Sequence, residues 1–333
     1  MPSLSLCLIV KNESYFLENC LSTAREFVDE IVVVDTGSTD NTREIATRLA
    51  DRVLDYVWRD HFADARNFSI DHASGDWIMV LDADEVIEPE HWRELRHLIA
   101  ATDKDAFFLE QRNYSHEPAN EGWIPIPRRT AYTRDYKGYK PNPIGRLFRN
   151  NGQIRYSGRV HEVIDTSVAE GQLESLDIPI HHHMDEDPAK SKRDRQLNYL
   201  RIIEQDLEDE SDGRLFTAAG SIRMHYLEDF EGAIAHLQRA IELGDKVDHN
   251  RESVAICRYR LGDLDTAYTD YMALYESGHR TVELCNNLAN LAVKREQFSF
   301  AADLLEEGLA LGVVDPEVRM RLEHNIRYLR GRA

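Results

Sequence analysis

The stretch Trp77-Ile-Met-Val-Leu-Asp82-Ala-Asp84-Glu85 sets the architecture expected for the N-terminal half of this chain. Five apolar residues run directly into three carboxylates, and a short continuous apolar run is typical of a strand buried on both faces of a parallel sheet. The carboxylates would then lie at the carboxyl edge of the sheet, where open α/β folds bind ligands. Because side chains alternate along an extended backbone, Asp82 and Asp84 can both point at one hard cation. An isolated D-x-D is more often a solvated acidic turn, so the flanking segments decide between the two interpretations.

The segments before this stretch alternate between strand and helix patterns. Apolar runs predict strands at 4–10 and 31–35 and a weaker strand at 52–57, and apolar residues at helical spacing predict helices between them. Strands and helices in this order indicate βαβ units and a mostly parallel sheet. The sequence therefore predicts an α/β domain with a Rossmann-like sheet.

Asp35 closes the second of these strands and is followed by Thr36-Gly37-Ser38. A carboxylate at the carboxyl edge of a sheet can accept hydrogen bonds from a base N–H or a ribose hydroxyl. Gly37 lets the backbone approach a ligand closely, because glycine has no side chain. We interpret Asp35 as a ligand-binding residue rather than as part of a plain capping turn.

Four motifs in the first 85 residues together resemble those of a family 2 glycosyltransferase with the GT-A fold. They are Ile9-Val-Lys-Asn-Glu13, Val33-Val-Asp35-Thr-Gly-Ser-Thr-Asp40, Ala65-Arg66-Asn67 and Leu81-Asp82-Ala-Asp84-Glu85. The resemblance implies an enzyme of the hexosyltransferase type that uses a nucleotide-sugar donor, usually a UDP-sugar. It also implies a divalent cation, Mn²⁺ or Mg²⁺, and inversion at the anomeric carbon.

The same resemblance implies roles for individual residues. The backbone around Val10 and the carboxylate of Asp35 would contact the base. Arg66 would lie beside the nucleotide, Asp82 would reach the ribose or the shell of the metal, and Asp84 would ligate the metal. These roles suit the chemistry, because a divalent cation prefers carboxylate oxygens and offsets the charge of a departing nucleoside diphosphate.

Two further assignments compete with ordinary structural alternatives. An inverting enzyme needs a general base for the acceptor proton, and Glu162 lies after the metal motif, where related enzymes carry that base. The alternative for Glu162 is a surface glutamate at the end of a strand. Arg66 could be a helix-surface arginine paired with Asp60 or Asp64, although its sequence context favours the nucleotide site.

Three consecutive histidines, His181, His182 and His183, follow a strand-like run. In GT-A enzymes a late histidine commonly joins the D-x-D as a metal ligand, and imidazole suits Mn²⁺ better than Mg²⁺. Alternation places His181 and His183 on one face of the strand and His182 on the other. We predict His182 as the ligand. No cysteine partner lies nearby, which argues against an independent zinc site.

Residues 110–145 are polar and rich in aromatic side chains. A loop region of this length in a compact domain is usually functional, and we interpret it as the region that faces the acceptor. The aromatic residues argue against a disordered linker.

The composition changes after Asp185, and an internal repeat of 34 residues follows a charged helix predicted at 188–210. Three columns share this period, which is that of tetratricopeptide repeats: Phe230, Leu264 and Phe298; Ala233, Ala267 and Ala301; Gly244, Gly278 and Gly312. The resemblance to tetratricopeptide repeats covers 212–312, with a closing helix predicted at 316–330. We therefore divide the chain into a GT-A catalytic domain, 1–187, and a domain of a bridging helix and tetratricopeptide repeats, 188–333.

Repeats of this kind bind peptides or join subunits, so they predict a peptide or protein acceptor or a homo-oligomer. The layout is similar to that of the glycocin-type peptide S- and O-glycosyltransferases. Two alternatives stay open: an enzyme that glycosylates a saccharide of an envelope polysaccharide, and a GT-A scaffold without catalysis. A nucleotidyltransferase is disfavoured, because Lys11-Asn12-Glu13-Ser14 is not a glycine-rich phosphate loop.

Composition argues against several other classes. A net charge of -20 over 333 residues disfavours nucleic acid or an anionic membrane as a partner. No apolar run approaches the roughly 20 residues needed to span a bilayer, and the N-terminus lacks the pattern of a signal peptide. The scattered cysteines show no metal-binding spacing and indicate buried thiols in a reducing compartment, so we expect a cytoplasmic protein.

Overall fold

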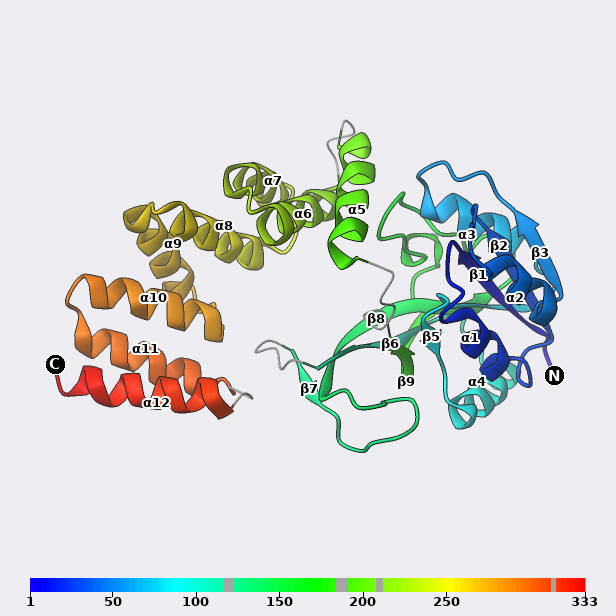
Figure 1. Ribbon diagram of the computed structural model, residues 1–333, viewed down its shortest axis with the longest axis horizontal. Helices are drawn as coiled ribbons and strands as arrows, with labels where there is room; N and C mark the ends of the chain where they lie inside the picture. The colour runs from blue at the N-terminus through cyan, green and yellow to red at the C-terminus, as the bar shows by residue number, and fades with distance from the viewer. Residues whose placement is uncertain (117–121, 184–190, 208–211, 313–315, 333) are drawn as a thin grey trace. The chain divides into compact units, whose positions relative to one another are not determined.

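The computed structural model describes residues 1–116, 122–183, 191–207, 212–312 and 316–332. The chain separates into two compact units, one of Met1–Glu117 with Ile124–Ala189 and one built mainly from Lys190–Ala333. Figure 1 shows a sheet with covering helices in the first unit and a succession of helices in the second. The domain boundary predicted between 187 and 188, and both ends of the helix predicted at 188–210, lie outside the described residues.

A mixed sheet forms the centre of the first unit. Its strands follow the order β3-β2-β1-β4-β8-β6-β9-β5, with β7 paired to β8. The strands are β1 Leu4–Val10, β2 Glu30–Asp35, β3 Arg52–Asp55, β4 Trp77–Val80, β5 Glu85–Val86, β6 Ala106–Ser115, β7 Ile124–Pro125, β8 Gly138–Arg149 and β9 Leu173–His182. The first four in the spatial order are parallel, whereas β8 pairs antiparallel with both β4 and β6. The predicted α/β class is confirmed. The second half of the sheet is mixed, because β5 and β9 also pair antiparallel whereas β6 and β9 pair parallel.

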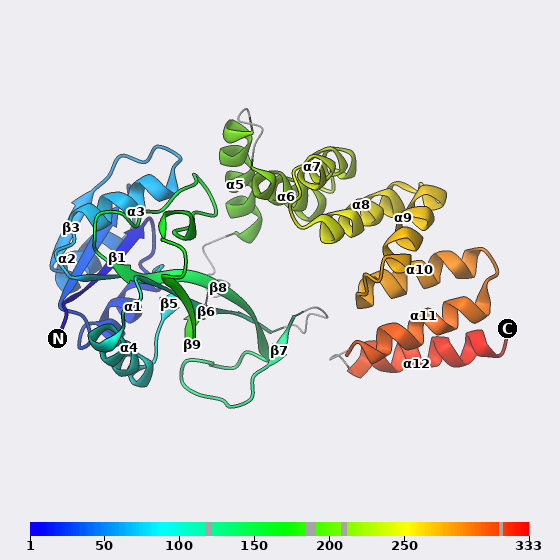
Figure 2. The ribbon, with the colours of Figure 1, turned by 180° about the vertical axis from the view of Figure 1, so that it is seen from behind.

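Helices cover both faces of the parallel half, which explains its continuous apolar runs. The helical segments of this unit are α1 Leu17–Ala24, α2 Thr42–Leu49, α3 Phe62–Asp71, α4 Pro89–Ala101 and the short 3₁₀ turn η1 Asp165–Ser167. Helices α1, α2 and α4 pack against the face that carries Trp77 and Met79. Helix α3 and the segment 154–164 pack against the face that carries Ile78 and Val80. Figure 2 shows α3 and α4 on opposite sides of β1.

The region 110–145 was predicted to be a long loop, and that prediction is wrong for most of its described residues. Strand β6 continues to Ser115 and β8 begins at Gly138, and the two strands form one antiparallel ladder. Pairing overrides the polar composition, because a neighbouring strand satisfies the backbone hydrogen-bonding groups whatever the side chains are. Tyr114, Tyr136 and Tyr139 are buried together in one aromatic cluster, so these three side chains form no exposed acceptor surface.

The second unit consists of helices that follow the predicted repeat. They are α5 Lys192–Asp206, α6 Gly213–Ile222, the π-helical turn η2 Arg223–Leu227, α7 Phe230–Glu242, α8 Val247–Leu261, α9 Leu264–Glu276, α10 Val282–Lys294, α11 Phe298–Ala310 and α12 Pro316–Arg330. The repeated alanines of α7, α9 and α11 are fully buried, where a small side chain lets helices approach. The repeated glycines after these helices have φ values of +80°, +92° and +103°, which glycine adopts without strain. The predicted tetratricopeptide-like array is confirmed.

Two further expectations concern cysteines and membrane spans. Cys7, Cys20, Cys257 and Cys285 are buried and form no disulfide, as predicted. Within the described ranges, none of the helices combines the length and apolarity that crossing a bilayer requires.

Candidate active site

The residues predicted to bind the donor gather at the carboxyl edge of the parallel strands. Val10 ends β1 and pairs in register with Asp35, which ends β2. Asp82 and Asp84 follow β4, which lies on the other side of β1. Because parallel strands place their carboxyl ends at the same edge, residues distant in the sequence meet there.

Asp35 is held by the turn that follows it. The residue is 4% exposed, and its Oδ1 accepts hydrogen bonds from the backbone N–H groups of the two residues after Thr36, at 2.9 and 2.8 Å. Its Oδ2 lies 4.0 Å from the guanidinium of Arg43. The carbonyl of Val10 is already engaged, because it accepts hydrogen bonds from the backbone N–H and the hydroxyl of Thr36. Of the Val10 carbonyl and the Asp35 carboxylate, it is therefore Oδ2 of Asp35 that can still accept a hydrogen bond from a ligand.

Arg66 joins two carboxylates that are far apart in the sequence. Its Nε donates to Oε1 of Glu162 at 2.5 Å, and its Nη2 donates to Oδ1 of Asp82 at 2.7 Å. The residue is only 5% exposed, so the alternative of a helix-surface arginine paired with Asp60 or Asp64 does not hold. Glu162 has a side chain that is 12% exposed, and it belongs to this cluster rather than to the surface.

Arg146 is a residue of this cluster that we did not predict. Its Nη2 donates to Oδ2 of Asp82 at 2.5 Å and to Oε1 of Glu85 at 2.9 Å, and the residue is 1% exposed. Gln111 donates to the same oxygen of Glu85 at 2.6 Å. The available signal was a charged residue inside the buried end of a strand, because a charge in that position requires a partner.

The two arginines keep Asp82 ionised. Burial raises the pKa of this carboxyl group, but the charges and hydrogen bonds of Arg146 and Arg66 outweigh burial and hold the pKa of Asp82 well below its usual range. In Glu85 burial is the largest effect, and it raises the pKa. Asp82 thus orients two guanidinium groups, and a ribose or a metal shell that contacted Asp82 would share its oxygens with them.

His182 is the histidine that faces Asp84. Its Nε2 lies 3.3 Å from Oδ2 of Asp84, and its Nδ1 lies 2.7 Å from Oδ1 of Asn113. Because an amide oxygen only accepts, Nδ1–H donates to Asn113, which leaves Nε2 as the nitrogen for Asp84 or a metal. Burial lowers the pKa of His182, but the attraction of Asp84 outweighs it and raises the pKa to about 9. Burial likewise opposes ionisation of Asp84, but His182 outweighs it and lowers the pKa of Asp84.

His181 and His183 belong instead to the aromatic cluster of β6 and its neighbours. Nδ1 of His181 lies 2.6 Å from the hydroxyl of Tyr114, and Nε2–H of His183 donates to the carbonyl of Tyr132 at 2.8 Å. Burial is the main cause that lowers the pKa of His181 to about 3 and that of His183 to about 4. Alternation along β9 therefore separates two neutral, buried histidines from the charged one that faces Asp84.

Asp84 and His182 fit a divalent cation. When two ligand atoms each lie about 2.0–2.2 Å from one cation, with an angle of 90–110° between them at the cation, they are roughly 2.8–3.6 Å apart. Nε2 of His182 and Oδ2 of Asp84 are 3.3 Å apart. A carboxylate with an imidazole whose other nitrogen is hydrogen-bonded suits a first-row divalent metal such as Mn²⁺. Two protein ligands leave positions for phosphate oxygens and water.

Comparison with known sequences identifies the class to which this fold and this site belong. The profile of glycosyl transferase family 2 matches residues 5–155. A TPR repeat-containing protein of Synechococcus elongatus is 30% identical over 330 residues, which cover 93% of this chain and 76% of that protein. The SPbeta prophage-derived glycosyltransferase SunS of Bacillus subtilis is 26% identical over 261 residues, which cover 76% of this chain and 56% of SunS. The chain is thus a glycosyltransferase. It belongs to glycosyl transferase family 2, with an N-terminal GT-A domain and a tetratricopeptide-like helical region after it.

Two solved structures align with this chain at low similarity. Residues 1–349 of S. aureus TarS in complex with UDP-GlcNAc align with 83% of this chain and 92% of that one, at 15% identity and a TM-score of 0.45. Glucosyl-3-phosphoglycerate synthase from Mycobacterium tuberculosis, in complex with Mn²⁺, UDP and glucosyl-3-phosphoglycerate, aligns with 62% of this chain and 79% of that one, at 16% identity and a TM-score of 0.43.

Proposed function

We propose that this chain transfers a hexosyl unit from a nucleotide-sugar, a UDP-sugar, to an acceptor with inversion at the anomeric carbon. The observation that carries the proposal is the placement of Asp84 and His182, which lie 3.3 Å apart at the carboxyl edge of the sheet. The same edge holds the ion-paired chain of Asp82, Arg66 and Glu162. Membership of family 2 sets the class of reaction, and these side chains offer the groups that such a reaction requires.

The donor would bind across the ends of β1, β2 and β4. Oδ2 of Asp35 would accept a hydrogen bond from the base, and the buried guanidinium groups of Arg66 and Arg146 would attract the diphosphate. Asp84 and His182 would hold Mn²⁺ or Mg²⁺, with Mn²⁺ favoured by the imidazole, and this ion supplies Lewis-acid stabilisation of the departing nucleoside diphosphate.

Inversion needs one displacement and one base. The acceptor oxygen or sulfur attacks the anomeric carbon, and the bond from that carbon to the phosphate oxygen breaks, so the electron pair leaves with the nucleoside diphosphate. Glu162 would take the acceptor proton. Its Oε1 accepts the hydrogen bond from Arg66, so the proton would go to Oε2 while Arg66 keeps the carboxylate oriented.

The repeat unit supports a peptide or protein as the acceptor. A cavity of ≈ 510 Å³ lies among α7, α8 and α9. Acidic, basic and apolar side chains line this cavity, and the lining includes Glu242, Arg251, Arg258, Asp270 and Leu274. A polypeptide offers amide groups and varied side chains, which a lining of this kind accommodates. Association of two copies through the same helices is the alternative use of this unit.

Calorimetric titration of the full chain with UDP and with GDP, each with and without Mn²⁺, tests the donor site. We expect UDP to bind only when Mn²⁺ is present, and GDP to bind more weakly. Asp84→Ala should weaken metal-dependent binding by more than ~10-fold, because it removes a proposed ligand. Glu162→Gln should bind UDP like the wild type, since the amide oxygen keeps the contact with Arg66, and should lose transfer to peptide acceptors.

Three outcomes would contradict parts of this proposal. Wild-type UDP affinity in Asp84→Ala would remove the metal assignment. Normal transfer by Glu162→Gln would place the base elsewhere. No binding of either nucleotide to the folded wild-type chain would favour a scaffold role over glycosyl transfer.

A further inference from the structure

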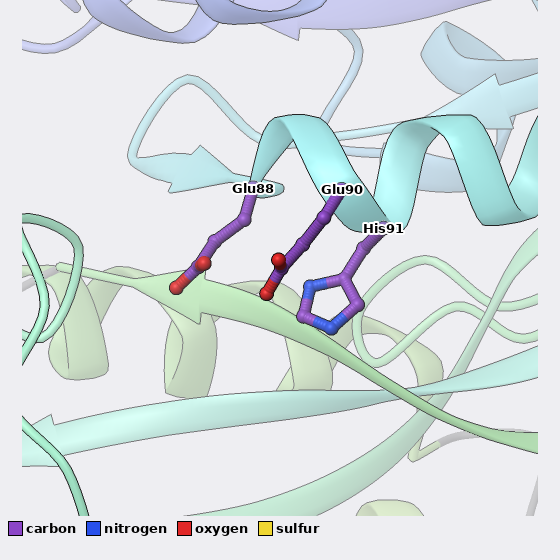
Figure 3. A group of neighbouring side chains, drawn as sticks. All are labelled: Glu88, Glu90 and His91. Carbon is purple, nitrogen blue, oxygen red and sulfur yellow. The ribbon is translucent and has the colours of Figure 1, made fainter.

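A second group of side chains with atoms that can ligate a metal lies at the start of α4. Glu88, Glu90 and His91 each offer one ligand atom, and these atoms lie within 4.8 Å of one another. Figure 3 shows the three side chains leaving the first turn of α4 on the same side, with the Glu90 carboxylate beside the ring of His91. An acidic cluster alone is no metal site, so the surroundings of this group decide its role.

His181 provides an independent observation that points to a ligand. The residue is 1% exposed, and in the described part of the chain its Nε2 has no hydrogen-bond partner. This nitrogen lies 3.2 Å from Oε1 of Glu88 without forming a hydrogen bond to it. The other ring nitrogen, Nδ1, is engaged by the hydroxyl of Tyr114, which is how a metal-ligating histidine uses its second nitrogen.

His91 also has a ring nitrogen that lacks a hydrogen-bond partner among the described residues. This nitrogen, Nδ1, is buried. A buried polar atom without a partner is unfavourable, and the carboxylates of Glu88 and Glu90 repel each other at close range. One divalent cation between these groups would relieve both effects.

Ordinary roles do not account for Glu88. It is the N-cap residue of α4, but its side chain accepts no hydrogen bond from the first turn, so capping does not explain its position. Thr130 donates to its Oε1 at 3.3 Å, and Oε2 remains for a ligand. The positive end of the α4 dipole opposes a cation only weakly, and the two carboxylates outweigh it.

We propose that a second cation site, for an ion of the Zn²⁺ class, is formed by Glu88, Glu90, His91 and His181. Two carboxylates and two imidazoles make a four-ligand set that suits tetrahedral Zn²⁺, whereas Mg²⁺ avoids nitrogen ligands. Tetrahedral ligands at about 2.0–2.2 Å lie roughly 3.3–3.6 Å apart. Glu88 and His181 already have nearly this separation, at 3.2 Å, whereas the ligand atoms of Glu90 and His91, which lie within 4.8 Å of each other and of Glu88, would have to move closer around the ion. The absence of a nearby cysteine argued against an independent zinc site, but here the carboxylates of Glu88 and Glu90 supply the ligands that cysteines would otherwise provide.

The role of this site is structural and does not depend on the proposed function. His181 pairs with Val86 of β5, and the next residue of β9, His182, faces Asp84. A cation held by α4 and His181 would fasten the helix to β9. It would thereby fix the backbone that carries His182 without touching the donor.

Zinc binding by the full chain in an Asp84→Ala background tests this inference, because the background removes a ligand of the other candidate site. After dialysis against Zn²⁺, we expect elemental mass spectrometry to find about one ion per chain. The added pair Glu90→Gln and His91→Ala should weaken binding by more than ~10-fold. Co²⁺ in place of Zn²⁺ should give the intense visible absorption of four-fold coordination in the background and not in this variant.

Glu94→Gln with His97→Ala is the matched control, since both residues lie exposed on the same helix and the same groups are lost. This control should bind Zn²⁺ like the background. No Zn²⁺ on the folded background protein, or equal weakening in the two double variants, would overturn the inference. Circular dichroism establishes that each variant is folded, and the Co²⁺ spectrum of the intact ligand set tests the site without changing it.

Discussion

Buried charges in the candidate active site hold one another in place. Arg66 and Arg146 both donate hydrogen bonds to Asp82. Arg66 also donates to Glu162, and Arg146 also donates to Glu85. A buried charge is stable only when it is paired, so removal of either arginine would leave carboxylates uncompensated. Arg146 is therefore as important for the arrangement of this site as the residues that the motifs singled out.

The pair of Asp84 and His182 makes the stability of the metal-free protein depend on pH. The folded pKa of His182 is about 9 against 6.5 for the free side chain, because Asp84 outweighs the effect of burial. Its contribution is fully present below pH 6.5 and is lost as the pH rises through about 9. The lowered pKa of Asp84 acts at the acidic end, where stability falls as that group is protonated. Urea denaturation across the alkaline window should show this decline.

His182→Gln is the control for this pH dependence, since it removes the titrating group. Its free energy of unfolding should show no decline assignable to residue 182 between pH 6.5 and 9. Mn²⁺ affinity of the wild type should rise across the same window, because the metal and the proton compete for Nε2. If the free energy of unfolding fell equally with pH in the wild type and in His182→Gln, the pKa assigned to His182 would be wrong.

Helices of the repeat unit differ in how they begin. Asp263 caps α9 through a hydrogen bond from the backbone N–H of Thr266, and Asp229 caps α7 in the same way. Gln297 occupies the equivalent position before α11 with similar angles, φ −85° and ψ 60° against −79° and 72° for Asp263, but forms no side-chain cap. The third repeat therefore lacks a stabilising contact that the first two have.

Gln297→Asp should stabilise the repeat unit. An aspartate N-cap contributes about 1 kcal/mol, less a few tenths for the lost hydrogen bond from the exposed Tyr268 hydroxyl. Asp263→Ala should destabilise the unit by about 1 kcal/mol, because it removes the equivalent cap. Thermal and urea unfolding measure both changes. If the free energy of unfolding changed in the same direction in the two variants, this position would not act through capping.

The two units of the molecule have separate cores. Among the described residues of the first unit, large apolar clusters lie on both faces of the sheet. Separate clusters lie among the described helices of the second unit. A core of its own is what allows a unit to fold alone, which supports our proposal of a catalytic domain followed by a repeat domain.

A chain truncated to Met1–Ala189 tests this division. We expect it to unfold in one cooperative transition and to bind UDP with Mn²⁺ as tightly as the full chain, because the proposed donor residues all lie within it. It should lose transfer to a peptide acceptor, since the helices proposed to hold the acceptor are absent. A truncated chain that folds but binds no nucleotide would show that the donor site requires the repeat unit.

Local patterns predicted the elements that owe their conformation to their own side chains. The first strand, Leu4–Val10, and the last helix, Pro316–Arg330, have the predicted bounds, because apolar periodicity is a property of neighbouring residues. The ladder of β6 and β8 was missed, since β8 carries prolines and polar residues and owes its extended conformation to its partner.

Order and spacing along the chain were enough to establish the α/β class, the family motifs and the 34-residue repeat. Alternation also separated His182 from its two neighbours, but only packing shows that the face with His182 meets Asp84. The same holds for the contacts of Arg66 with Glu162 and of Arg146 with Glu85, which join residues 96 and 61 positions apart. Desolvation and Coulomb energies govern these contacts, and both depend on distances in space that no spacing along the chain contains.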